Sequence, residues 1–287
     1  MKVSMDYYTY MGKKWDLWHY LSECDKLNLD GIHIPDCDVT YPHERHTMSK
    51  PRKEWKFKSL SEEELMKVKD FCDKRNWEKI LSGWGGPYAS ERSEDCLYLT
   101  KLDLETANLL GAKVMRIVPD GDREDPRRYK IEWAVRNLKK AAELAESYDI
   151  ILGLETHAVI THCSDIIEII DRVNSDYLRV TLDTGNSIAS SDGDPTLPFL
   201  QAIESLAPNI VATHIRDMTY DRLTKTWHCV PCGEGVVDLP AIATILKNSN
   251  YKGTLALEYI TDNQLDRAPK DIPTEIIKDC IEYLRML

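Results

Sequence analysis

The apolar positions of this chain alternate between two patterns. Short continuous runs of Ile, Leu and Val are typical of strands buried on both faces, whereas apolar residues three and four apart are typical of helices. The short runs begin near residues 2, 30, 79, 113, 150, 178, 210 and 254. The clearest helical pattern joins Ile131, Ala134, Val135, Leu138, Ala141, Ala142 and Ala145. The alternation predicts eight strands, each followed by a helix.

Helix-end signals support this division. Ser61 with Glu64 forms a capping-box sequence, and Gly111 is a typical residue just beyond a helix C-terminus. Asp238, followed by Pro240, predicts another helix start, and Ser164 is expected to cap the helix after the fifth strand.

The spacing of the strands predicts the fold class. Successive starts lie roughly 28 to 49 residues apart, which is the length that repeated strand–helix units require. No linker or change of composition divides the chain. We therefore predict an α/β protein, a (β/α)₈ TIM barrel, as a single domain over residues 1–287; a doubly wound open sheet is the alternative.

Four predicted strands end in a residue that can bind metal: Glu155, Asp183, His214 and Glu258. The carboxyl ends of parallel strands meet at one end of a barrel, so these side chains are expected to converge. One such residue alone is more often a cap or a salt-bridge partner, but four on consecutive strands favour a site. Three carboxylates and an imidazole predict one divalent ion, first Mn²⁺, with Mg²⁺, Co²⁺ or Zn²⁺ as alternatives.

Three neighbouring polar residues are further candidates. His157 follows Glu155 and is expected to contact substrate. Asn186 follows Asp183 and is read either as a donor to a substrate hydroxyl or as a turn residue. Asp217 is expected either to orient the metal ligands or to be a solvated loop charge.

Composition narrows the partners and the compartment. The net charge is −11, from 37 Lys and Arg against 48 Asp and Glu, which argues against a nucleic-acid partner. The N-terminus lacks the apolar core of a signal peptide, and no apolar run reaches the 18 residues of a membrane helix. The eight cysteines are scattered and sparse. We expect a reduced, cytoplasmic protein with no membrane partner, which is a possible homo-oligomer.

Residues 36–60 form the least regular segment, with Pro42 and Pro51 and a basic, aromatic end that includes Trp55. A loop of this length in a compact domain is usually functional or disordered. We expect it to cover the catalytic end of the barrel.

The same motifs carry a family resemblance that extends over essentially the whole chain. They resemble the xylose isomerase-like TIM-barrel superfamily of sugar phosphate isomerases and epimerases. The motifs are Leu-Glu155-Thr-His157, Leu-Asp183-Thr-Gly-Asn186, His214-Ile-Arg-Asp217, Gly233-Glu-Gly-Val-Val-Asp238, Leu-Glu258-Tyr, Ser82-Gly-Trp84-Gly-Gly and Gly111-Ala-Lys-Val-Met-Arg116.

The resemblance implies that the four strand-end residues hold a divalent metal, with Glu155 and Glu258 as the acid–base pair. It also implies substrate contacts from Trp84 and Arg216. Two positions depart from the ketose 3-epimerases of that group. Asn186 stands where they have a substrate-binding histidine, and Tyr220 stands at the offset of their substrate arginine.

The leading hypothesis is a metal-dependent isomerase or epimerase in carbohydrate metabolism that acts on a ketose or related polyol ketone through an enediolate. The alternative is a lyase or dehydratase that uses the same site on a keto-sugar or keto-inositol. A DNA-repair enzyme like endonuclease IV needs further metal ligands and a basic groove, which this acidic chain does not offer. A complete ligand set argues against a barrel that only binds.

Overall fold

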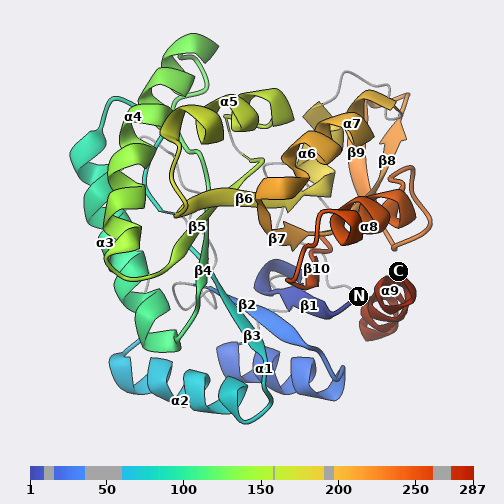
Figure 1. The fold of residues 1–287 in the computed structure, drawn as a ribbon. Helices are drawn as coiled ribbons and strands as arrows, with labels where there is room; N and C mark the ends of the chain where they lie inside the picture. Colours follow the sequence, from blue (N-terminus) through green and yellow to red (C-terminus); the bar gives the residue numbers. More distant parts are fainter. Residues whose placement is uncertain (10–15, 36–59, 84, 158, 191–196, 261–272) are drawn as a thin grey trace.

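Eight parallel strands form one nearly closed barrel (Figure 1). The computed structural model describes residues 1–9, 16–35, 60–83, 85–157, 159–190, 197–260 and 273–287. The strands are neighbours in the order β10-β1-β2-β3-β4-β5-β6-β7, and every pair is parallel. They are β1 (Val3–Asp6), β2 (Gly31–Pro35), β3 (Glu78–Ser82), β4 (Val114–Ile117), β5 (Ile151–Glu155), β6 (Leu178–Asp183), β7 (Ile210–His214) and β10 (Leu255–Leu257).

The barrel closes between β7 and β10. Ile215 pairs with Leu257 in a parallel bridge, the Ile215 N–H donates to the Ala256 carbonyl over 2.7 Å, and the Glu258 N–H donates to the Ile215 carbonyl over 3.2 Å. These bonds lie directly beside two of the predicted metal ligands. The predicted (β/α)₈ TIM barrel is confirmed.

Helices connect the strands and cover the outside of the barrel in Figure 1. Apolar residues fill the interior and the layer between the sheet and the helices, so most strand positions are buried on both faces. The helices are α1 (Leu17–Lys26), α2 (Glu62–Asp73), α3 (Ser93–Leu110), α4 (Arg127–Glu146), α5 (Cys163–Val173), α6 (Thr184–Ser190), α7 (Leu197–Leu206), α8 (Leu239–Asn248) and α9 (Thr274–Met286).

Most of the predicted helix ends are confirmed. Ser61 and Glu64 form both bonds of the capping box, Gly111 ends α3 with φ 70°, and the Asp238 side chain accepts from the Ala241 N–H. The prediction for Ser164 is wrong, because α5 begins one residue earlier at Cys163. His162 precedes it and makes no side-chain capping bond.

An antiparallel hairpin after β7 was not predicted. It consists of β8 (Asp217–Asp221) and β9 (Thr226–Val230), and it lies between β7 and α8. The sequence gives a weak signal here because both strands are short and neither contains a continuous apolar run like those of the barrel strands, and the hairpin tip is exposed.

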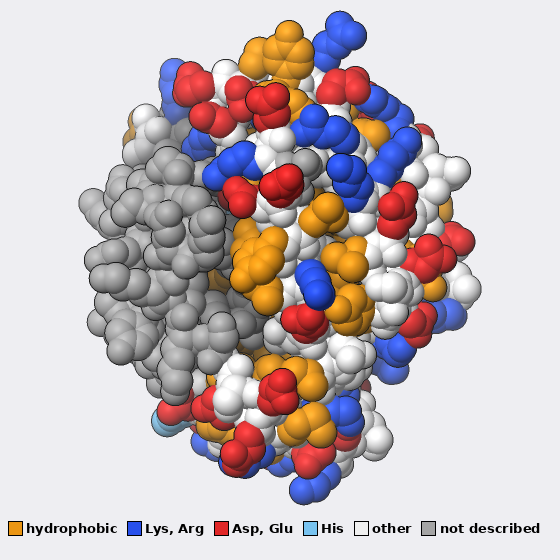
Figure 2. Space-filling model, turned by 90° about the vertical axis from the view of Figure 1, so that its left-hand side faces the viewer, with side chains coloured by type: hydrophobic (Ala, Val, Ile, Leu, Met, Phe, Trp, Pro, Cys, Tyr) orange, Lys and Arg blue, Asp and Glu red, His pale blue; other side chains and the backbone are white. Residues whose placement is uncertain are grey.

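The outer surface is of mixed charge where Figure 2 shows it. On this face, which lies on the left of Figure 1, acidic and basic side chains are interspersed, with scattered apolar side chains between them. Tyr98 and Leu102 of α3 and Tyr129 of α4 are among the exposed large apolar residues. In the described ranges, no helix has the length and apolar character needed to cross a bilayer.

Candidate metal centre and active site

The four predicted metal ligands converge at the carboxyl end of the barrel. Glu155, Asp183 and His214 are the last residues of β5, β6 and β7, and Glu258 directly follows β10. Each offers a ligand atom within 4.8 Å of the other three. None of the four residues is more than 5% exposed. The strand ends thus form one compact, buried donor set.

His214 lies between two of the carboxylates. Its Nδ1 atom is 2.7 Å from Glu155 Oε1 and 3.3 Å from Glu258 Oε2. Glu258 Oε2 is buried and accepts no hydrogen bond of good geometry from the described residues. A buried oxygen in that condition is costly unless a cation or another donor reaches it.

Asp183 is held by two residues that were predicted as substrate contacts. Arg216 Nη2 donates to Asp183 Oδ2 over 2.8 Å, and Asn186 Nδ2 donates to the same oxygen over 2.9 Å. Arg216 Nη2 also donates to Asn186 Oδ1 over 2.5 Å. Gly185 allows this packing, because a Cβ atom there would lie 2.5 Å from Arg216 Nε. Both residues therefore position a predicted ligand, and their contact with substrate stays a prediction.

Arg116 supplies a second buried guanidinium. It comes from β4, is 2% exposed, and its Nη2 lies 2.6 Å from Glu155 Oε2. A carboxylate is frequently paired with arginine in this way when it must stay ionised in a low-dielectric interior. Glu155 therefore has His214 on one oxygen and Arg116 on the other.

The pKa values show how these charges interact. Burial raises the pKa of Asp183 to about 7 although Arg216 opposes the rise. Burial acts in the same direction on Glu155, but Arg116 and His214 outweigh it and lower that pKa to about 2. For His214, burial lowers the pKa, but Glu258 and Glu155 raise it well above its ordinary value.

The donor set fits a divalent cation. With neutral imidazoles, the cluster holds two more carboxylates than guanidiniums; its charged members are Asp6, Glu155, Asp183, Glu258, Arg116 and Arg216. One divalent ion would neutralise this excess. Without a cation, protons take up the charge, as the raised pKa values of Asp183 and His214 indicate. Glu155, Asp183, His214 and Glu258 are the residues that would hold the ion.

His157 lies just beyond β5 and forms an antiparallel bridge with Ile160. Burial lowers the pKa of His157 to about 4, so the ring is neutral near pH 7. A neutral imidazole has one donor and one acceptor, which suits a sugar hydroxyl. Two predictions fall outside the described residues: Trp84, and residues 36–59 of the segment that was expected to cover this end of the barrel.

Asp217 is buried, but its carboxylate accepts from backbone N–H groups of β8 and of the chain that follows the hairpin rather than contacting the metal ligands. Its carboxylate accepts from the N–H groups of Gly233 at 2.8 Å, Gly235 at 2.9 Å and Val237 at 3.1 Å. The solvated-charge interpretation is wrong, because Asp217 is 1% exposed. Its contacts show that it organises the loop before α8.

The sequence reasoning missed three buried polar residues at this end of the barrel. Asp6 ends β1, His33 lies in β2 and Arg116 lies in β4. Their side chains are at most 2% exposed. The signal was the same one used for the ligands, a charged or imidazole residue in an apolar strand, but it was applied only to the last four strands of the barrel.

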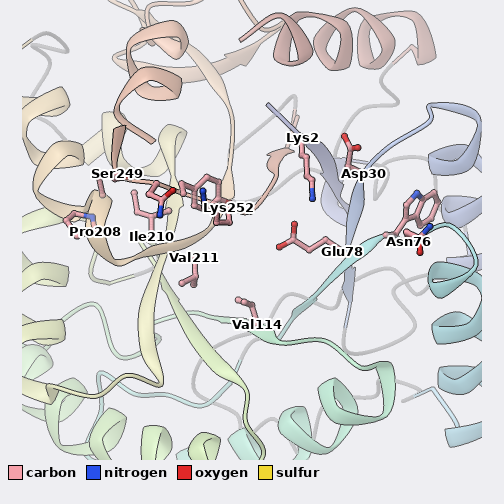
Figure 3. Close-up of a pocket in the computed structure, with 15 residues that line it drawn as sticks. Lys2, Asp30, Asn76, Glu78, Val114, Pro208, Ile210, Val211, Ser249 and Lys252 are labelled. Atoms are coloured by element: carbon pink, nitrogen blue, oxygen red, sulfur yellow. The ribbon is translucent and has the colours of Figure 1, made fainter. Parts of the chain in front are cut away.

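A pocket of about 580 Å³ lies at the opposite end of the barrel (Figure 3). Its lining includes Lys2, Asp30 and Glu78, which stand at the beginnings of strands, and it includes none of the predicted site residues. Active sites of TIM barrels lie at the carboxyl ends of the strands, so this pocket is not the candidate active site.

Two comparisons with known proteins cover most of the chain. The family model described as xylose isomerase-like TIM barrel matches residues 39–287. A D-psicose 3-epimerase of Enterocloster bolteae is 22% identical over 275 residues, covering 88% of this chain and 80% of that protein.

Solved structures share the fold over the full length of the chain. The IolI protein with a bound zinc atom has a TM-score of 0.72 at 18% identity and covers 100% of this chain and 96% of its own. The probable 3-DHS dehydratase AsbF of Bacillus anthracis has a TM-score of 0.70 at 16% identity and covers 99% of each chain. With the family model matching most of its length, this chain belongs to the xylose isomerase-like TIM-barrel family.

Proposed function

We propose that this protein is a divalent-metal-dependent sugar isomerase or epimerase that acts on a ketose or a related polyol ketone. The observation that carries the proposal is the buried donor set of Glu155, Asp183, His214 and Glu258, whose ligand atoms lie within 4.8 Å of one another. The 3-epimerase relative supports an enzyme, and a small carbohydrate as its substrate. Mn²⁺ is the proposed ion, because three of the four ligands are hard carboxylates.

The proposed chemistry uses the two glutamates as base and acid. One carboxylate removes the proton beside the substrate carbonyl, which gives an enediolate. The other glutamate, which enters the step protonated, gives its proton to the same carbon in an epimerase, so that the two glutamates exchange protonation states. In an isomerase the proton goes to the neighbouring carbon, and a hydroxyl proton moves between the two oxygens. The ion would supply positive charge that stabilises the oxygen atoms as they become negative.

The surrounding residues keep these groups in the required state. Arg116 lowers the pKa of Glu155, although burial opposes this, so Glu155 stays ionised and able to accept a proton. Arg216 and Asn186 fix Asp183 through five hydrogen bonds to its two oxygens. His157, neutral near pH 7, is proposed to bind a substrate hydroxyl.

A lyase is the second candidate, and the observation that favours it is the dehydratase of the same fold. Expulsion of a hydroxyl from the carbon next to the enediolate would need the same base and the same positive charge. The two reactions differ in the product, because a dehydratase releases water and leaves an unsaturated or tautomerised product.

Turnover in D₂O tests the proposal and separates the two reactions. Purified protein with Mn²⁺ would be incubated with a panel of ketoses and keto-inositols, and the products followed by NMR and mass spectrometry. We expect solvent deuterium on a carbon next to the carbonyl with no change in elemental composition, and loss of turnover when a chelator is added. A product that has lost water would overturn the isomerase, and turnover that resists the chelator would overturn metal dependence.

A further inference from the structure

His214 has a second set of partners on the side of its ring that faces away from the metal ligands. His214 Nε2 lies 3.1 Å from His33 Nδ1 and 3.5 Å from Asp6 Oδ2. His33 Nδ1 is itself 3.5 Å from Asp6 Oδ2. All three side chains are at most 1% exposed. The imidazole of His214 therefore lies between the metal ligands and this pair.

Asp6 is fixed in place on both carboxylate oxygens. Its Oδ1 atom accepts from the Tyr8 N–H over 2.8 Å, and its Oδ2 atom accepts from the Ser82 hydroxyl over 2.7 Å. These donors belong to the chain after β1 and to the end of β3. Rotation of the carboxylate away from His214 would break two buried hydrogen bonds.

The position of the pair matters because a histidine binds a metal through a nitrogen that carries no proton. Nδ1 is the nitrogen of His214 that faces Glu155 and Glu258, so the proton must then be on Nε2. A histidine that ligates a metal usually donates its other N–H to a carboxylate or another acceptor, which fixes its tautomer and ring orientation. His33 and Asp6 stand at that position.

We propose that Asp6 and His33 are positioning residues that hold His214 with its proton on Nε2 and with Nδ1 free to bind the ion. The proposal rests on the metal site proposed above. Asp6 and His33 come from β1 and β2, on the other side of the barrel closure from His214. Residues of β1 and β2 thus fix the tautomer and the orientation of His214, a ligand that β7 supplies.

The same three atoms have a competing interpretation as a second metal site, because their separations of 3.1 to 3.5 Å also suit neighbouring ligands of one ion. Charge decides against it. One divalent ion neutralises the buried excess of two carboxylates over guanidiniums, and a second ion would leave an uncompensated positive charge in the interior. The pair is therefore assigned to the support of one ion.

Substitution of Asp6 tests this assignment. In Asp6→Asn the oxygen that accepts from Tyr8 N–H stays in place, so the amide NH₂ faces His214 Nε2 and favours the tautomer with the proton on Nδ1. Removing such a partner typically weakens metal binding about 10- to 100-fold. Affinity for Zn²⁺ would be measured by competition with a chelator, and the His214 tautomer by ¹⁵N NMR. We expect weaker binding and, in the metal-free protein at a pH high enough to leave His214 with a single ring proton, a shift of that proton from Nε2 to Nδ1.

His33 provides a matched pair of variants. His33→Asn keeps an acceptor at the position of Nδ1, whereas His33→Leu has none, so Asn should restore much of the affinity that Leu loses. Ser4→Ala is the control, because Ser4 lies in β1 like Asp6 and its hydroxyl makes a buried hydrogen bond to Thr254. The substitution removes that bond without touching His214. If Asp6→Asn does not fold, the His33 pair carries the test.

The outcomes separate this inference from the proposed function. Equal zinc affinity and an unchanged His214 tautomer in Asp6→Asn and His33→Leu would overturn the positioning role. Two ions per chain in the wild type, with one lost in Asp6→Asn, would overturn it in favour of a second site. Wild-type protein that binds no divalent ion would overturn the proposed metal site itself.

Discussion

The two halves of the barrel use the same residue types at the same end for different purposes. In the ligand half, formed by β5, β6, β7 and β10, the strand ends carry the donor set. In the support half, formed by β1 to β4, Asp6, His33 and Arg116 contact those donors from behind. The ligand half is negative overall and the support half supplies a guanidinium and hydrogen-bond partners. Charge at a strand end therefore marks a candidate residue, and the contacts separate the proposed ligands from the residues that position them.

The largest expected effect belongs to the ligand half. Glu155→Gln and Glu258→Gln keep the size of each side chain and one oxygen but remove the proton acceptor. General acid–base catalysis contributes roughly 10²- to 10⁴-fold, and turnover should fall by that order in each variant. Glu78→Gln, at the opposite end of the barrel, is the control and should keep its rate. Steady-state kinetics would measure all three, and near-normal turnover in either site variant would remove that residue from the acid–base pair.

A second test breaks the contact between the halves. Arg116→Met keeps a long side chain but leaves Glu155 buried without its guanidinium partner. Removal of one member of a buried ion pair costs about 3 to 5 kcal/mol, and the free energy of unfolding at pH 7 should fall by that amount. Burial raises the pKa of Glu155 while Arg116 lowers it, so the pKa of Glu155 should be higher in the variant. As the pH falls, the variant should therefore lose activity at a higher pH than the wild type. An unchanged free energy of unfolding, together with loss of activity at the same acidic pH as in the wild type, would show that the two halves are not coupled by charge.

Asp217 is acidic and lies in the ligand half, yet its contacts are structural. In Asp217→Ala, the N–H groups of Gly233, Gly235 and Val237 lose a charged acceptor. Bonds of this type contribute about 1.5 to 3 kcal/mol each, and because the exposed loop can recover part of this with water, we expect a loss of about 4 kcal/mol in unfolding free energy. Metal stoichiometry should stay at one ion, whereas a variant that loses the ion and keeps its stability would make Asp217 part of the metal centre.

The smallest expected effect concerns Asp120, which follows β4 in the support half. Burial raises the pKa of Asp120 to about 6. An acid whose pKa is higher in the folded than in the unfolded state destabilises the fold when it is ionised, and that penalty disappears as the pH falls from about 6 toward 4. Asp120→Asn should therefore gain up to about 3 kcal/mol at pH 8 and nothing at pH 4. Denaturant unfolding at both pH values measures this, and a gain that does not depend on pH would contradict it.

The strands, and the meeting of four donor residues at their ends, could be predicted from the sequence because both depend on local signals. A buried parallel strand is a continuous apolar run, and a ligand at its end interrupts that run, as Glu155 does after Ile151–Leu154. The hairpin was missed because Thr226–Val230 has no such run. Ser164 was placed at a helix start because serine is a common cap, but the chain enters α5 at His162 instead.

The partners of the ligands are harder to predict, because they depend on contacts between distant segments. Asp6 and His214 are separated by more than two hundred residues, and the parallel register across the closure decides whether they meet. Asn186 was read either as a donor to substrate or as a turn residue, whereas its side chain bonds to Arg216 and Asp183, and its contact with substrate stays a prediction. Spacing in the sequence cannot distinguish these alternatives, since each puts the residue just beyond the same strand.

Anomalous diffraction from a crystal grown with Mn²⁺ tests the central claim most directly. The account predicts one peak per chain, about 2.0 to 2.4 Å from carboxylate oxygens of Glu155, Asp183 and Glu258 and from His214 Nδ1. Asp6 and His33 should lie behind His214 with no ion of their own. A peak bound by Asp6, His33 and His214 Nε2 in place of the predicted one, or no peak at this end of the barrel, would contradict the account.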